Sequence, residues 1–63
     1  MKMKLELYKQ ALETVEDMLY DDGVYPDDET MEMIKENIKE FIIVDGIKDI
    51  NKIIEYLNLE DLY

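Results

Sequence analysis

The side chains of this chain that could do chemistry are carboxylates, lysines and two threonines. The sequence has no His, Cys, Ser, Arg or Trp, so nucleophilic catalysis is limited to Thr14, Thr30, the lysines and the carboxylates, with no imidazole as a base. Phosphate binding usually uses Arg or a glycine-rich loop, and here there are only two isolated glycines. We therefore expect no enzymatic activity, no catalytic residues and no cofactor.

A group of acidic residues near Gly23 raises the question of a Ca²⁺ or Mg²⁺ site. The group comprises Asp21, Asp22, Asp27, Asp28 and Glu29. An EF-hand loop with Gly23 at its sixth position would have Met18 and Tyr20 at positions 1 and 3. Neither residue offers a useful side-chain oxygen for the cation, so the pattern fails. We expect a solvated, capped turn and no dedicated metal site.

The negative charge is concentrated in the window 13–32, which has nine acidic residues and no lysine. Residues 1–12 carry a net charge of +2 and residues 33–63 carry −3, so the window supplies nine of the ten units of net negative charge. Such a field repels nucleic acid and membrane surfaces and attracts basic surfaces. The nine acids are Glu13, Glu16, Asp17, Asp21, Asp22, Asp27, Asp28, Glu29 and Glu32.

The length and composition predict a single small helical domain, residues 1–63. Hydrophobic residues make up 48% of the chain, which is enough for one compact core, and the absence of cysteine excludes disulfides. There is no signal-peptide pattern at the N-terminus and no run approaching eighteen apolar residues. The frequent Ile, Lys, Asn and Tyr, with no Arg, indicate an AT-rich source genome. We expect a cytoplasmic protein of a bacterial host cell.

The periodicity of the apolar residues predicts an all-α fold, a compact three-helix bundle with helices over about 3–20, 28–44 and 47–57 and a short C-terminal turn. The first helix has one apolar stripe at spacings of three and four residues, with Glu13, Asp17 and Asp21 in a row on the opposite face. Gly23 fits a helix C-terminus, and Asp27 fits the N-cap of the second helix. The stripe of the first helix contains Leu5, Tyr8, Leu12, Val15 and Leu19, widened by Ala11 and Met18.

The second and third helices are predicted from the same spacing. The second should bury Met31, Ile34, Ile38, Phe41 and Ile42, and the third should bury Ile47, Ile50, Ile54 and Leu57. Asp45-Gly46 between apolar runs is also a hairpin signal. We prefer a helix break with Asp45 or Asp49 as the next cap, because alternation with a period of two fails on both sides. Residues 59–63 are expected to form a last turn or a short docking tail.

The concentrated charge leads to a hypothesis about function. We expect a protein-binding inhibitor that blocks the basic nucleic-acid-binding surface of a nuclease or another nucleic-acid-binding protein, with no direct binding of nucleic acid or membrane. Its partner-binding site would be a single outward-facing patch of the nine acids, with Tyr20 and Tyr25 as aromatic anchors. Both tyrosines could equally cover the edge of the core, and the charge could serve only solubility.

In size and charge the chain resembles the small acidic inhibitors of phages and mobile elements, which include DNA mimics, anti-CRISPR and anti-restriction proteins, and also resembles antitoxins and immunity proteins. This likeness transfers no residue roles. The alternative hypothesis is a structural or adaptor module that forms a homodimer or docks on a partner helix through apolar residues. Those residues would be Met33, Ile43, Val44, Leu59, Leu62 and Tyr63.

Overall fold

Three helices and a final 3-10 turn make up most of the chain in a computed structural model that describes residues 2–62, with side chains from residue 4 onward. The elements are α1 (Lys2–Asp21), α2 (Asp28–Ile43), α3 (Ile50–Leu57) and η1 (Leu59–Leu62). The predicted all-α three-helix bundle is confirmed. The alternative of a hairpin around residues 41–50 is wrong, because residues 41–43 complete α2 and no strand occurs within 2–62.

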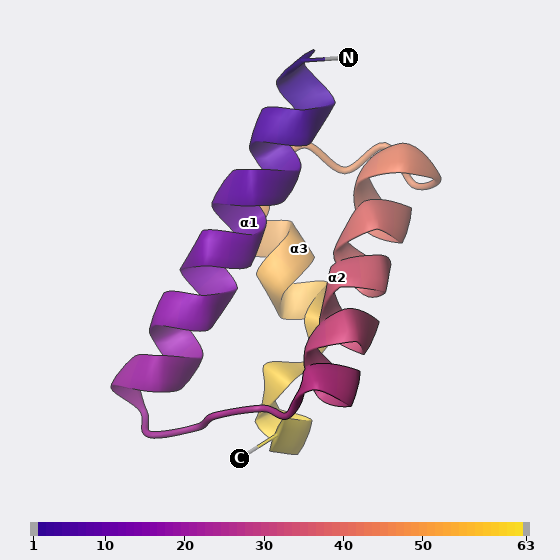
Figure 1. Cartoon of the computed structure of the whole chain (residues 1–63). Helices are drawn as coiled ribbons and strands as arrows, with labels where there is room; N and C mark the ends of the chain where they lie inside the picture. Colours follow the sequence, from indigo (N-terminus) through magenta and orange to yellow (C-terminus); the bar gives the residue numbers. More distant parts are fainter. Residues whose placement is uncertain (1, 63) are drawn as a thin grey trace.

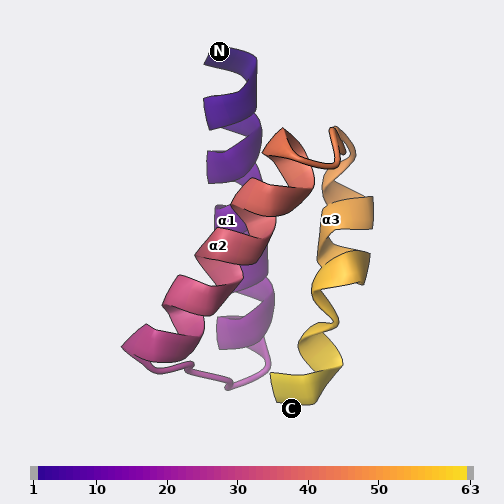
Figure 2. The same cartoon turned by 90° about the vertical axis from the view of Figure 1, so that its right-hand side faces the viewer.

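The helices form an elongated bundle of 33 × 19 × 18 Å, in which each helix contacts the other two. Figures 1 and 2 show α1 and α2 running in opposite directions, with α3 packed along one side of the pair. The 22–27 connection and η1 lie at one end of the bundle, and the start of α1 and the 44–49 connection lie at the other (Figures 1 and 2). Residues far apart in sequence therefore meet at each end.

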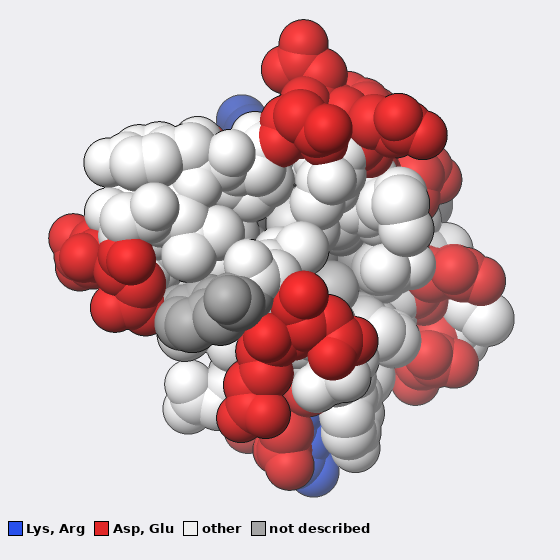
Figure 3. All heavy atoms as spheres, turned by 90° about the horizontal axis from the view of Figure 1, so that it is seen from below, with Lys and Arg blue, Asp and Glu red and all other residues white. Residues whose placement is uncertain are grey.

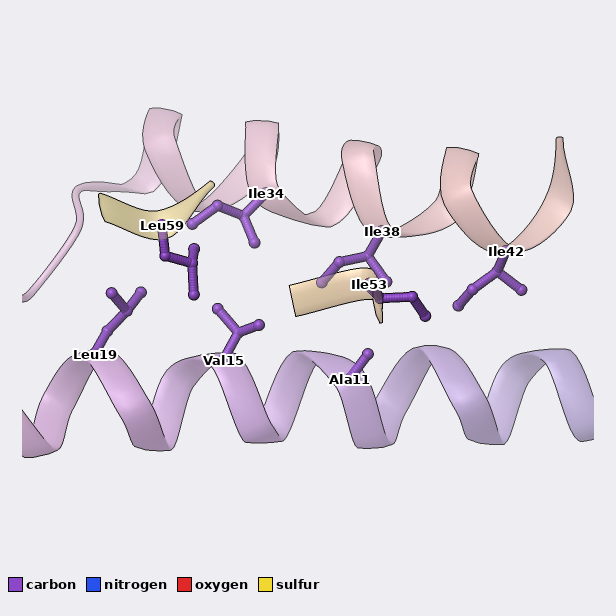
Figure 4. Close-up of a cluster of buried hydrophobic side chains, with 8 residues drawn as sticks. All are labelled: Ala11, Val15, Leu19, Ile34, Ile38, Ile42, Ile53 and Leu59. Atoms are coloured by element: carbon purple, nitrogen blue, oxygen red, sulfur yellow. The ribbon is translucent and has the colours of Figure 1, made fainter. Parts of the chain in front are cut away.

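The core is built from side chains spaced four residues apart on the two long helices. Figure 4 shows how they interdigitate with two side chains from the C-terminal segment. The buried residues are Ala11, Val15 and Leu19 of α1, Ile34, Ile38 and Ile42 of α2, and Ile53 and Leu59. Burial of such side chains stabilises the fold by about 1.5–3 kcal/mol for each large aliphatic group.

The predicted stripes of α1 and α3 are displaced from the buried lines. On α1, two residues of the predicted stripe are exposed: Leu5, with 55% of its surface exposed, and Met18. Leu7, which was not predicted, packs against the core instead. On α3 the fully buried residue is Ile53, which the 3–4 spacing skipped. Ile53 lies between the half-buried Ile50, Ile54 and Leu57 on the helical surface, so it faces the core most directly.

The connection after α1 has the hydrogen bonds of a Schellman motif. The N–H of Val24 donates to the carbonyl of Leu19 (2.8 Å), and the N–H of Gly23 donates to the carbonyl of Tyr20 (3.0 Å). Gly23 has φ +77°, the left-handed conformation that this motif requires. The prediction that Gly23 ends the first helix is therefore confirmed.

The third helix begins three residues later than predicted, at Ile50, and α2 ends at Ile43. The carboxylate of Asp49 caps α3 by accepting from the N–H of Asn51 (3.0 Å), so Asp49 and not Asp45 is the cap. The N–H of Ile47 donates to the carbonyl of Phe41 (3.0 Å), and the Ile47 side chain packs against the core. Because Ile47 is held by the last turn of α2, its backbone does not join α3.

Candidate functional site

The fold divides the charge between the two ends of the bundle. One end, formed by residues 13–38 and 54–62, contains thirteen of the seventeen acidic residues and one of the seven lysines, a net charge of −12. We call this part the acidic end. The packing of Leu19 and Ile34 against Leu59 brings its segments together (Figure 4). The lysine end, residues 4–12 and 39–53, contains five lysines and four acids.

The acidic end is larger than the window seen in the sequence. Glu55, Glu60 and Asp61 join it because α3 and η1 run back toward the 22–27 connection (Figure 2). Because consecutive helices in a three-helix bundle alternate in direction, the end of the third helix lies near the first connection. That rule would have placed these three acids at the acidic end. Reading the charge along the chain missed them because they lie far from Glu13–Glu32 in sequence.

The nine predicted acids are at the surface, Glu16 being half-buried and the others exposed. They do not form the single patch that we expected. Val15 and Ile38 both point into the core (Figure 4), so Glu13 and Asp17, two residues to either side of Val15, lie on the far side of α1 from α2. Figure 3, a view of this end, shows acidic side chains in separate groups around its edge with uncharged surface between them. The acids surround the end because two helices and η1 each turn their polar faces outward.

The two tyrosines beside the acidic connection form a stacked pair. The ring centroids of Tyr20 and Tyr25 are 5.4 Å apart and the rings are inclined by 20°. Tyr25 is 74% exposed, and neither ring belongs to the side chains packed against the core. The pair is an exposed aromatic platform among carboxylates.

The hydrogen bonds and ion pairs on α2 are local. Lys35 pairs with Glu32 (3.7 Å) and Lys39 with Glu36 (3.9 Å), the two i,i+3 pairs that the sequence allows. The carboxylate of Asp27 accepts from the N–H of Thr30. Hydrogen bonding by the Thr30 side chain and by this N–H holds the pKa of Asp27 below its usual range. Within the part of the chain that the structure describes, no three acids are arranged to hold a metal ion.

Two hollows lie at the lysine end. The larger, about 590 Å³, is bordered by Leu7, Ile42, Ile47 and the rim residues Lys4 and Lys48. The smaller, about 240 Å³, lies between α1 and α2 and is lined by Lys4, Leu5, Tyr8, Lys39, Ile42 and Ile43. The polar residues Glu6 and Gln10 also line the larger hollow.

The apolar docking surface proposed as the alternative is only partly present. Met33, Ile43 and Val44 are exposed as expected. Leu59 is buried in the core and Leu62 is half-buried against it, because η1 folds back onto the bundle. These two residues are therefore not available to a partner, and Tyr63 lies outside the described residues.

The fold and surface define a small all-α bundle with strongly polarised charge. No protein-family model, curated protein or solved structure matches the chain. None of the helices within residues 2–62 is both long and apolar enough to cross a membrane.

Proposed function

We propose that the protein is an inhibitor that binds, through its acidic end, a basic nucleic-acid-binding surface on another protein. The observation that carries the proposal is the net charge of −12 at one end of a bundle 33 Å long. A nucleic-acid duplex carries one charge per about 1.7 Å of its axis, so half the length of this bundle corresponds to about ten phosphates. The acidic end and a duplex therefore offer a basic surface similar amounts of charge.

The distribution of the acids favours a concave target. Carboxylates on α1, on α2 and on η1 point in different directions around the end (Figure 3), so a flat surface would contact only some of them. A cleft lined by lysine and arginine would surround the end and contact most of them. Basic clefts of this kind hold nucleic acid in nucleases and in the effectors of bacterial defence systems, which are the partners that we propose.

The stacked tyrosines supply the second part of the proposed interface. Charged rims mainly speed and orient association, whereas large aromatic groups in a desolvated centre provide much of the binding energy. Tyr20 and Tyr25 are held as a pair by the turn at Gly23, so little side-chain entropy remains to be lost on binding. A phage or mobile element would use such a protein as an anti-CRISPR, anti-restriction or antitoxin factor.

The test begins with capture of partners from a low-GC bacterial lysate by the immobilised protein. We expect a basic nuclease or DNA-binding protein to be recovered at low salt and lost at high salt, since surface charge attraction is screened. The recovered protein is then assayed for DNA binding or cleavage with and without the inhibitor. Competition with a DNA duplex is the expected result.

A matched pair of variants separates the effect of charge at the acidic end from the effect of the total charge. The test variant combines Asp17→Asn, Asp21→Asn and Asp28→Asn at the acidic end, and the control combines Glu6→Gln, Glu40→Gln and Asp45→Asn at the lysine end. Both remove three negative charges. We expect the test variant to bind at least tenfold more weakly with a flatter salt dependence. Equal binding by the two variants would contradict a specific acidic surface and leave only a general effect of charge.

A further inference from the structure

An uncovered apolar strip runs between α1 and α2 at the lysine end. Leu5 and Ile43, 55% and 62% exposed, form the two sides of the smaller hollow, with Tyr8 and Ile42 as its floor. Lys4 and Lys39 stand at its rim, and the Lys39 ammonium lies 5.9 Å from the centre of the Tyr8 ring.

This strip opens on the side of the α1–α2 pair that faces away from α3. Phe41, on the opposite flank of α2, contacts Tyr56 of α3 with ring centroids 5.9 Å apart. Figure 2 shows α3 on one side only of the two longer helices. The described part of the chain therefore has no element that covers the strip.

The same face changes its charge toward the acidic end. On α1, side chains spaced four residues apart follow Tyr8 toward the acidic end in the order Leu12, Glu16. On α2, which runs the other way, Lys39 is followed toward the acidic end by Lys35 and then Met31. Leu12 and Met31 are half-buried and pack against the core with one edge showing. Asp28 and Glu32 flank Met31 on this side of α2. The face thus has apolar side chains along its middle, lysines at the rim of one end and carboxylates at the other.

We propose that the occupant of this face is a second copy of the same chain, packed antiparallel about a two-fold axis. In this arrangement Lys4 and Lys39 of each copy lie beside Glu16 and Asp28 of the other, and the apolar strip of each copy packs against the Leu12 and Met31 edges of the other. A parallel arrangement would place the two acidic ends, each with a net charge of −12, side by side. The charge pattern therefore selects the antiparallel pair. The four long helices would then form one bundle.

The size of the face predicts a weak dimer. Within the described residues, Leu5 and Ile43 are the only large apolar side chains of this face that are exposed, so we expect the contact to bury less than the ~800 Å² per partner of a standard interface. Each copy also carries −10, although charges farther apart than about 8 Å are screened at physiological salt. Dimerisation is thus concentration-dependent. This inference does not rest on the proposed function: the Tyr20–Tyr25 pair and η1 stay outside the contact, and the two surfaces share Glu16 and Asp28.

The first test is sedimentation equilibrium from about 10 μM to about 1 mM at physiological salt, a range that covers weak interfaces. We expect the mean mass to rise from one chain toward two. Ile43→Glu should raise the dissociation constant at least tenfold. Met33→Glu is the matched control, since Met33 is 63% exposed on α2 but outside the hollow, and it should leave the constant unchanged. Circular dichroism of both variants verifies that they remain folded.

A second measurement determines the orientation. Val44 is 73% exposed, lies at the lysine end and does not line the hollow, and the chain has no cysteine, so Val44→Cys gives a single site for a spin label. The antiparallel dimer should give a separation between labels comparable to the 33 Å length of the bundle. A short separation would overturn the antiparallel arrangement. A single-chain mass at every concentration, or equal dimerisation of the Ile43→Glu variant, would overturn the interface itself.

Discussion

The N–H of Thr30 donates a hydrogen bond of 2.9 Å to Oδ1 of Asp27, and this contact fixes the first turn of α2. Hydrogen bonding by the Thr30 side chain, together with this N–H, stabilises the ionised carboxylate, which is why the pKa of Asp27 lies below its usual range. The positive end of the helix dipole adds to the preference for negative charge at this position.

Replacing Asp27 by Asn should therefore destabilise the protein in a pH-dependent way. Because the pKa is lower in the folded state, the ionised carboxylate contributes stability above the unfolded pKa, and this contribution is lost as the pH falls through the folded pKa. We expect the melting temperature of Asp27→Asn to be below that of the natural protein at neutral pH, and the difference to shrink as the pH falls through the lowered pKa of Asp27. Thermal melts followed by far-UV circular dichroism measure the difference, with Asp45→Asn as the control for one lost charge. A difference in melting temperature that stayed constant with pH would show that the charge of the Asp27 carboxylate does not contribute to the stability of the cap.

Ile53 is the only fully buried side chain that α3 contributes within the described residues, so it should dominate the stability of that helix. Ile53→Ala removes packed atoms and leaves a cavity, which costs about 2–5 kcal/mol. A chain of this size has a free energy of unfolding of only about 3–9 kcal/mol, so this variant should lose a large part of its stability. Urea denaturation of the milder Ile53→Val, expected to cost about 1 kcal/mol, can be compared with Ile54→Val at the half-buried neighbour. Equal costs would show that the core is not centred on Ile53.

Asn58 ends α3 in the left-handed conformation, with φ 56°, and its side-chain amide donates to the Asp61 carboxylate at 3.1 Å. Asn58→Ala and Asn58→Gly both remove that hydrogen bond, but only alanine is strained at positive φ. We expect the alanine variant to be less stable than the glycine variant by about 1 kcal/mol in urea denaturation. Identical midpoints would mean that the turn into η1 relaxes to a different conformation.

The acidic end should make the fold sensitive to salt. Thirteen carboxylates with one lysine repel one another, and added monovalent salt screens that repulsion, so the melting temperature should rise with ionic strength. The Asp17→Asn, Asp21→Asn, Asp28→Asn variant should melt higher at low salt and respond less to added salt. The Glu6→Gln, Glu40→Gln, Asp45→Asn control should keep most of the natural response. A melting temperature independent of salt in the natural protein would contradict repulsion at this end.

Local signals in the sequence predicted most of the fold. Gly23 and Asp27 mark their helix ends through backbone conformation and hydrogen bonds that involve only nearby residues, so both were predicted correctly. The start of α3 was predicted too early because Ile47 has a helical spacing to Ile50. Its N–H is instead bonded to Phe41 in the preceding helix, a preference decided by tertiary packing that periodicity does not report.

The candidate surface was harder to predict than the fold. The amount of charge is visible in the sequence, but its spread over several faces depends on how α1, α2 and η1 are rotated about their axes. Helical spacing placed Glu13 and Asp17 correctly on the outer side of α1. It could not show that the carboxylates of α2 would point away from them, because the relative rotation of two helices is set by which residues, here Val15 and Ile38, enter the shared core.

The face-to-face tyrosine rings have a practical consequence for optical spectroscopy. The chain has no tryptophan, so its near-ultraviolet signal comes mainly from tyrosine, and Tyr20 and Tyr25 hold a fixed mutual orientation that should give coupled transitions. A conformational change or a bound partner that separates the two rings would therefore change the near-ultraviolet signal, and no added label would be needed to detect it. The protein thus has an intrinsic optical probe located at the connection between its two longest helices.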